Sequence, residues 1–182
     1  MARPHPKEMI GAAAAEFGED AVVDWCIALL TGEVTAEQAF SPELLPKLKW
    51  IGGEEVGGWA KLVAVNQYWV RVWAARALMY VWRDDAIPAL LIAADDPAWR
   101  VREHVARVTA QRELGQLADA LVPLLDHELP RVRATAVRAL GAAGEYEHAN
   151  ALKPLRNDPD NTVRAAVDRA LALLSQRLDR AL

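Results

Sequence analysis

Apolar residues recur at helical spacing through the second half of the chain. Val101, Val105 and Val108 fall on one side of a helix drawn at about 100° per residue, whereas Arg107 falls on the opposite side. The same pattern returns at intervals of 31 residues, because valine also stands at positions 70, 132 and 163. The spacing therefore predicts four equivalent amphipathic helices, which begin near Tyr68, Arg100, Pro130 and Asn161.

A shorter apolar segment precedes each of these helices. Leucines at 90, 121 and 152 keep the interval of 31 residues, and each follows an alanine. We predict short first helices over 86–93, 117–125 and 149–155, with a weaker copy over 54–64. Prolines fall inside the three stronger segments, where they either start or kink the helix. Each predicted unit is thus a pair of helices joined by a turn.

A period of this length indicates one supersecondary unit that stacks on copies of itself. We predict an all-α fold, a right-handed α-α solenoid whose four units lie near 53–83, 84–114, 115–145 and 146–182 within one continuous domain, 53–182. Residues 1–52 do not follow the period. They are predicted to form an N-terminal helical cap with helices near 7–17, 20–30 and 42–50, and Thr35 is expected to cap a further short turn of helix.

Composition is that of a water-soluble globular protein. Of 182 residues, 53% are hydrophobic and 25% charged, and no uncharged apolar run is long enough to span a membrane. A single cysteine, Cys26, excludes an internal disulfide framework, and the first residues lack the apolar core of a signal peptide. We therefore expect a cytoplasmic protein of bacterial type without a membrane partner. The net charge of −4 is uneven, since the acidic excess lies before residue 69.

The turn aspartates and the arginines that follow them resemble those of HEAT repeats. The short unit is most similar to the HEAT-like repeats of phycobilin lyases and many bacterial adaptors, and the resemblance covers 53–182. It implies a structural ladder in which a turn carboxylate holds an arginine of a neighbouring helix. The first unit has Val65 in place of the aspartate, and the third has His127, with Asp126 beside it. The ladder is expected to comprise Arg71, Arg102, Arg133 and Arg164 with Asp96, Asp126 and Asp158.

A second row of arginines lies opposite the apolar stripe, so stacking does not require it. The resemblance implies that this helix lines the concave face of the solenoid. Arginine suits carboxylates and phosphates because its planar group donates paired hydrogen bonds. We therefore expect a binding surface for an acidic peptide or protein, with a nucleic-acid backbone or a merely solvated face as the alternatives. Its predicted residues are Arg76, Arg107, Arg138, Arg169, Arg100 and Arg131, with Trp69 and Trp73 at one end.

No residue pattern points to a cofactor or a metal. His104, His127 and His148 occupy different places in the repeat, so no ligand cluster builds across units. HEAT-like-repeat DNA glycosylases provide an enzymatic alternative, because 68–76 is loosely similar to their Trp- and Arg-rich helix. Their carboxylate would have to come from Glu103 or from Asp84 and Asp85. We expect a non-enzymatic binding or scaffold module. Its last helix is a candidate for self-association through Val167, Ala170, Leu171, Leu174 and Leu178.

Overall fold

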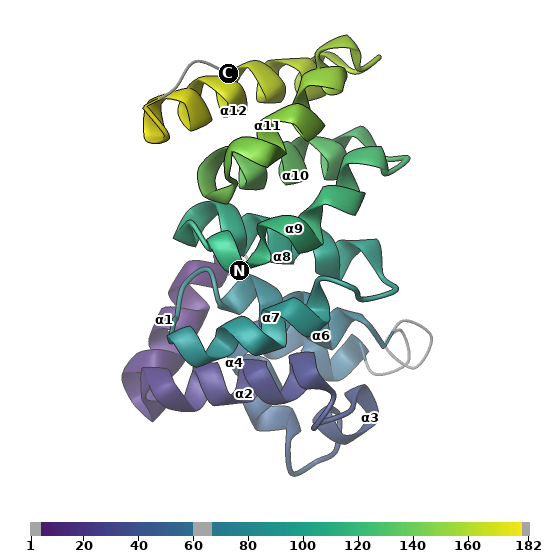
Figure 1. Cartoon of the computed structure of the whole chain (residues 1–182). Helices are drawn as coiled ribbons and strands as arrows, with labels where there is room; N and C mark the ends of the chain where they lie inside the picture. Colours follow the sequence, from purple (N-terminus) through teal and green to yellow (C-terminus); the bar gives the residue numbers. More distant parts are fainter. Residues whose placement is uncertain (1–4, 60–66, 180–182) are drawn as a thin grey trace. The chain divides into compact units, whose positions relative to one another are not determined.

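A computed structural model describes residues 5–59 and 67–179, and these residues contain helices and turns but no β-strand. The chain divides into two compact units, Met1–Val101 and Arg102–Leu182. The boundary falls within helix α8, Trp99–Arg112. Figure 1 draws unit 1 from purple to teal and unit 2 from teal to yellow. The predicted division at residue 52 stays a prediction.

Unit 1 is built around helix α2, Glu19–Thr31, which packs against α1, α6 and α7. Val22, Val23, Cys26 and Leu29 on α2 are fully buried, which explains its central place. The elements among its described residues are α1 (Pro6–Phe17), α2, α3 (Ala36–Ala39), α4 (Leu45–Gly52), η1 (Glu54–Trp59), α6 (Trp69–Ala77), η2 (Asp84–Ala86), α7 (Ile87–Ala93) and the first residues of α8.

The helices predicted before residue 53 agree with the structure to within a few residues. Thr35 caps α3 as expected, since its hydroxyl accepts from the amide of Gln38 at 3.2 Å and the Gln38 side chain accepts from the amide of Thr35 at 2.8 Å. The helix predicted over 54–64 begins at Glu54 as expected, but it is the 3-10 helix η1, which ends at Trp59. Residues 60–66 lie outside the described residues. These include Val65.

The second helix of the first predicted unit is shorter than expected. Instead of continuing to Trp82, α6 ends at Ala77. Tight turns follow it, in which the amide of Met79 donates to the carbonyl of Arg76 and the amide of Tyr80 to that of Ala77. Trp82 is held outside the helix, because its amide donates to the Glu19 carboxylate and its indole to Asp84, each at 2.8 Å.

Unit 2 contains two layers of helices (Figure 1). In each repeat of unit 2, the first helix is an α-helix that continues as a 3-10 helix. These pairs are α9 (Ala118–Leu121) with η4 (Val122–Asp126), and α11 (Tyr146–Leu152) with η5 (Lys153–Asn157). Pro123 and Pro154 stand in the first turn of the 3-10 portions, where a missing N–H costs little. The second helix of each repeat is α10 (Pro130–Ala143), α12 (Asn161–Arg177) or the part of α8 that follows Val101. A further 3-10 helix, η3, spans Gly115–Leu117.

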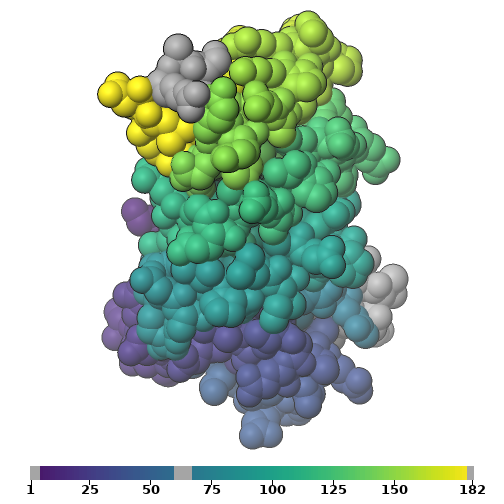
Figure 2. Space-filling view, in the orientation of Figure 1, coloured from purple at the N-terminus to yellow at the C-terminus, as the bar shows by residue number. Residues whose placement is uncertain are grey.

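Helices α10 and α12 pack closely, and the side chains of unit 2 form a continuous surface on the face that Figure 2 draws. The last helix therefore does not offer the apolar strip that we predicted for self-association. Val167, Ala170, Leu171 and Leu174 are buried within the unit, and Leu178 is half-buried. The prediction failed because helical periodicity identifies an apolar face but not the helix that covers it. Among the described helices, none is long and apolar enough to cross a membrane.

The ladder arginines of the structure reach forward to the turn of the next repeat. Nε and Nη2 of Arg133 donate to the two carboxylate oxygens of Asp158, each at 2.8 Å, and its Nη1 donates to the carbonyls of His127 and Glu128. In unit 1, Nε and Nη2 of Arg71 donate in the same way to the two carboxylate oxygens of Asp96. Each carboxylate also accepts from the amide two residues later, Ala98 or Asp160. The carboxylate thus joins two successive repeats and shapes the turn.

The middle step of this ladder lacks its carboxylate. Asp126, which we predicted to belong to the ladder, is exposed and forms no ion pair with an arginine among the residues described. His127 occupies the place of Asp96 and Asp158, because its Nδ1 accepts from the amide of Leu129 at 3.0 Å. Burial, and next the charge of Arg102, lower the pKa of His127. The buried Nε of Arg102 makes no hydrogen bond within the described part of the chain.

We expect His127→Asp to stabilise the protein by about 1–2 kcal/mol, because the new carboxylate would accept from Arg102 and retain the bond to the Leu129 amide. Urea unfolding at neutral pH measures the change. His127→Asn is the matched control, since an amide oxygen can accept from Leu129 but carries no charge. Equal stability of the two variants would show that Arg102 does not reach the position.

Candidate functional site

Three arginines of unit 2 occupy one equivalent position on three second helices. They are Arg107 on α8, Arg138 on α10 and Arg169 on α12, and all three are exposed as predicted. Close packing of α10 on α12, and an ion pair between α8 and α10, place these helices side by side. Arg131 at the start of α10 is also exposed. Below, Arg107, Arg131, Arg138 and Arg169 are called the arginine strip.

A buried carboxylate anchors two members of the strip. The side chain of Glu103 on α8 is 1% exposed, and its Oε2 accepts from Nη2 of Arg131 at 2.8 Å. Its Oε1 accepts from Nη2 of Arg131 and from Nη2 of Arg107, each at 2.9 Å. Burial raises the pKa of Glu103, but the hydrogen bonds from Arg131 and Arg107 outweigh burial and hold it below its ordinary value. Glu103 is therefore ionised and positions both guanidinium groups.

The two anchored arginines nevertheless remain open to solvent, with side-chain exposures of 44% for Arg107 and 60% for Arg131. Arg138 is exposed and makes no hydrogen bond or ion pair within the described residues. Nε of Arg169 donates to the carbonyl of Ala165 in its own helix at 2.9 Å. The sequence contained a signal for part of this arrangement, because Glu103 and Arg107 stand four residues apart on one helix. It contained none for the bond to Arg131.

Two residues that we predicted for the binding surface are not exposed, since Trp73 is buried in unit 1 and Arg76 is half-buried there. Trp73 is 5% exposed and lies against Gly52, where an added Cβ would come 3.1 Å from its ring. Nη2 of Arg76 donates to the carbonyl of Ile51 at 2.7 Å. Helix α4 packs against α6 and accounts for both corrections, because it covers Trp73 and accepts the bond from Arg76. Arg107 and Arg138, the counterparts of Arg76 on α8 and α10, are exposed.

Trp69 and Arg100 lie together in unit 1, half-buried in a stack of aromatic rings. Trp69 stacks on Tyr68 with a centroid distance of 5.6 Å and on Trp73 at 6.3 Å. The guanidinium carbon of Arg100 lies 4.3 Å from the ring centroid of Trp99 and 5.7 Å from that of Trp69. This cation–π arrangement stabilises the local packing. These residues belong to unit 1, whereas the arginine strip belongs to unit 2.

Within the described residues, no group of three or more His, Cys, Asp or Glu could hold a metal ion. The family model for HEAT repeats matches residues 87–173. The matched segment begins in α7 and includes the whole arginine strip. No curated protein matches the chain. The match and the all-helical structure support a HEAT-like repeat protein with an architecture consistent with an α solenoid. The phycobilin-lyase subtype and the similarity to DNA glycosylases are not part of this match.

Proposed function

We propose that this HEAT-like repeat protein binds an acidic segment of a partner protein through the arginine strip of unit 2. HEAT repeats generally serve as protein-interaction scaffolds, which supports a protein partner. The observation that carries the proposal is the exposure of Arg107, Arg138 and Arg169 at one register position of three adjacent helices. Stacking of the repeats does not use these side chains.

The strip presents positive charge in an ordered form. Glu103 neutralises part of the charge of Arg107 and Arg131 but holds both groups in place, which lowers the entropy lost when a ligand binds. Arg138 and Arg169 add two guanidinium groups that lack a carboxylate partner among the described residues. Planar guanidinium groups donate paired hydrogen bonds to carboxylates. An aspartate- or glutamate-rich surface is therefore the complementary partner.

The spacing of the strip suits a helical partner. Packed helices lie about 8–10 Å apart, so equivalent side chains on α8, α10 and α12 recur at about that interval. Along an α-helix the rise is about 1.5 Å per residue, so carboxylates seven residues apart are separated by about 10.5 Å. We therefore propose a partner helix with an acidic residue on every second turn, which lies across the three helices.

Binding of a fluorescein-labelled oligoglutamate peptide, followed by fluorescence anisotropy at low salt, tests this proposal. We expect the double variant Arg138→Gln, Arg169→Gln to bind about tenfold more weakly, because two charged contacts are lost at an exposed site. The matched control is Lys153→Gln, Arg156→Gln, which removes the same charge from η5 in the other layer of unit 2. Equal losses in the two double variants would mean that net charge, and not the strip, governs binding.

The alternative partner is a nucleic acid, because phosphates would engage the same guanidinium groups. A single-stranded oligonucleotide of the same net charge as the peptide separates the two. For each phosphate contact, the logarithm of the affinity for nucleic acid should fall by about 0.7 for every tenfold rise in salt concentration. We expect the peptide to bind more tightly than the oligonucleotide at every salt concentration. Tighter binding of the oligonucleotide would replace the acidic protein with a nucleic acid.

A further inference from the structure

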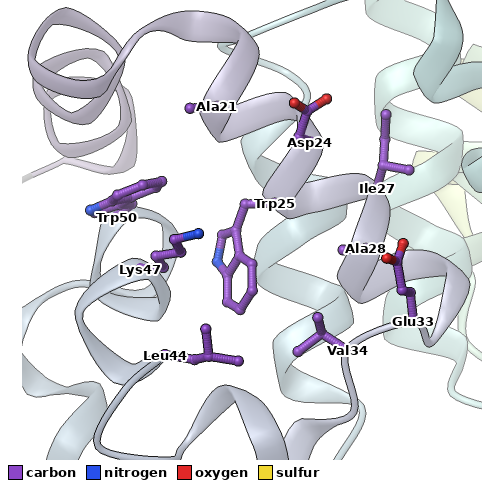
Figure 3. A pocket seen from close by; sticks show the side chains of 10 residues that line it. All are labelled: Ala21, Asp24, Trp25, Ile27, Ala28, Glu33, Val34, Leu44, Lys47 and Trp50. Carbon is purple, nitrogen blue, oxygen red and sulfur yellow. The ribbon is translucent and has the colours of Figure 1, made fainter.

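A pocket of about 520 Å³ opens in unit 1 between α2, the segment that follows α2, and α4 (Figure 3). Its apolar lining includes Ile27, Val34, Leu44 and Trp50. The pocket lies in the part of the chain that does not follow the repeat, so the stacking of repeats does not account for it. Its volume is within the range of small-molecule sites, about 300–1,000 Å³.

A buried hydrogen-bond donor in the wall of this pocket has no partner. Trp25 on α2 is 5% exposed, and its indole Nε1 makes no hydrogen bond within the described residues. Such a group carries a desolvation penalty that an acceptor would relieve. Figure 3 shows the indole nitrogen on the side of the ring that faces Lys47 and Leu44. Lys47 is exposed, and its Nζ lies 5.9 Å from the centroid of the Trp25 ring.

Charges of opposite sign line different sides of the pocket. Lys47 from α4 stands beside the indole nitrogen, whereas Asp24 and Glu33 lie beyond the ring (Figure 3). Asp24 is already bound to Nη2 of Arg83. The exposed carboxylate of Glu33 makes no ion pair in the described structure. An anionic acceptor is thus favoured near Lys47 and Trp25, and a cation near Glu33.

We propose that this pocket binds a short apolar peptide with free termini. The peptide carboxylate accepts from Trp25 Nε1 and pairs with Lys47, whose flexible exposed side chain moves to admit it. The terminal ammonium pairs with Glu33, and the apolar side chains contact Val34, Leu44 and Trp50. A sphere of this volume is about 10 Å across, which corresponds to about three extended residues at 3.3–3.6 Å each. This site belongs to unit 1 and the arginine strip to unit 2, and the proposal does not depend on the function of the strip.

Titration of the full chain with the tripeptide Leu-Ala-Leu tests the site by calorimetry and NMR. We expect the indole N–H resonance of Trp25, assigned by its loss in Trp25→Phe, to move downfield as the hydrogen bond forms. Lys47→Met keeps the apolar stem but removes the charge and should weaken binding about tenfold. Glu33→Gln should weaken it similarly. Both positions are exposed, so folding is not at risk in these variants.

The matched ligand control is Leu-Ala-Leu with an acetylated N-terminus and an amidated C-terminus, which has the same side chains without terminal charges. We expect it to bind at least tenfold more weakly than the free tripeptide. The double variant Arg138→Gln, Arg169→Gln should bind the free tripeptide as the unsubstituted chain does. Equal binding of the two ligands, no binding of either, or an unmoved Trp25 resonance would each overturn the proposal.

Discussion

Replacement of Arg133 by Met is expected to destabilise the protein by about 3 kcal/mol. Arg133 and Asp158 are largely buried and share two hydrogen bonds of 2.8 Å, so the variant leaves the carboxylate without its cationic partner. It also loses the bonds to the carbonyls of His127 and Glu128. Methionine retains most of the apolar stem, so lost packing contributes little. Urea unfolding at neutral pH measures the effect.

Arg164→Met is the matched control, because Arg164 occupies the equivalent position on α12. Among the described residues it donates only to the backbone carbonyl of Asp158 and reaches no carboxylate. We expect this variant to lose about 1 kcal/mol. Equal losses in Arg133→Met and Arg164→Met would show that the ion pair with Asp158 contributes nothing beyond a backbone hydrogen bond.

The same pair predicts a change in acid stability. Hydrogen bonds from Arg133 hold the pKa of Asp158 below its ordinary value. A depressed pKa contributes stability that is complete above the unfolded pKa, about 3.9, and is lost as pH falls through the folded value. Arg133→Met removes this cause. Below about pH 4, the free energy of unfolding of the variant should therefore decline less steeply with pH than that of the unsubstituted chain.

Replacement of Gly141 by Ala is the second large effect, with an expected loss of about 2 kcal/mol. A Cβ on Gly141 of α10 would lie 2.6 Å from Cβ and 2.7 Å from Cα of Ala170 on α12. Because the contact involves backbone, the two helices must separate, and the contacts of α12 with α10 weaken. The higher helix propensity of alanine, worth about 1 kcal/mol, offsets only part of this.

Gly11→Ala provides the control, since Gly11 lies inside α1 and an added Cβ would meet nothing within 4 Å. Here only helix propensity changes, and we expect a gain of up to about 1 kcal/mol. Thermal or urea unfolding of both variants should therefore give shifts of opposite sign. A stabilised Gly141→Ala variant would contradict the close approach of α10 and α12.

Repetition explains why the sequence predicted the helices of unit 2 well and those of unit 1 less well. Arg107 and Arg138 are exposed as expected, because each of their helices has equivalent neighbouring helices in the repeat pattern. Arg76 occupies the equivalent position on α6, yet it is half-buried and bonded to the carbonyl of Ile51 on α4, and α4 also covers Trp73. Helix α4 lies outside the repeat, so the period contains no information about its contacts.

Contacts between helices mark the second limit of prediction. The Glu103–Arg107 pair could be expected from its spacing within one helix, but the bond from Arg131 depends on how α8 meets α10. Likewise, the sequence placed a histidine near the missing ladder carboxylate without showing that His127 Nδ1 takes over its bond in the turn. The pocket beside Trp25 depends on how α2 meets α4, which no periodic pattern predicts.

The central claim is that the arginine strip, and not the ladder, contacts an acidic partner. NMR of the arginine Nε–Hε groups during titration with oligoglutamate tests it most directly. The account predicts that the signals of Arg107, Arg131, Arg138 and Arg169 shift, while those of Arg133 and Arg164 stay in place. Shifts confined to the ladder arginines or to unit 1, or no shift at any arginine, would contradict it.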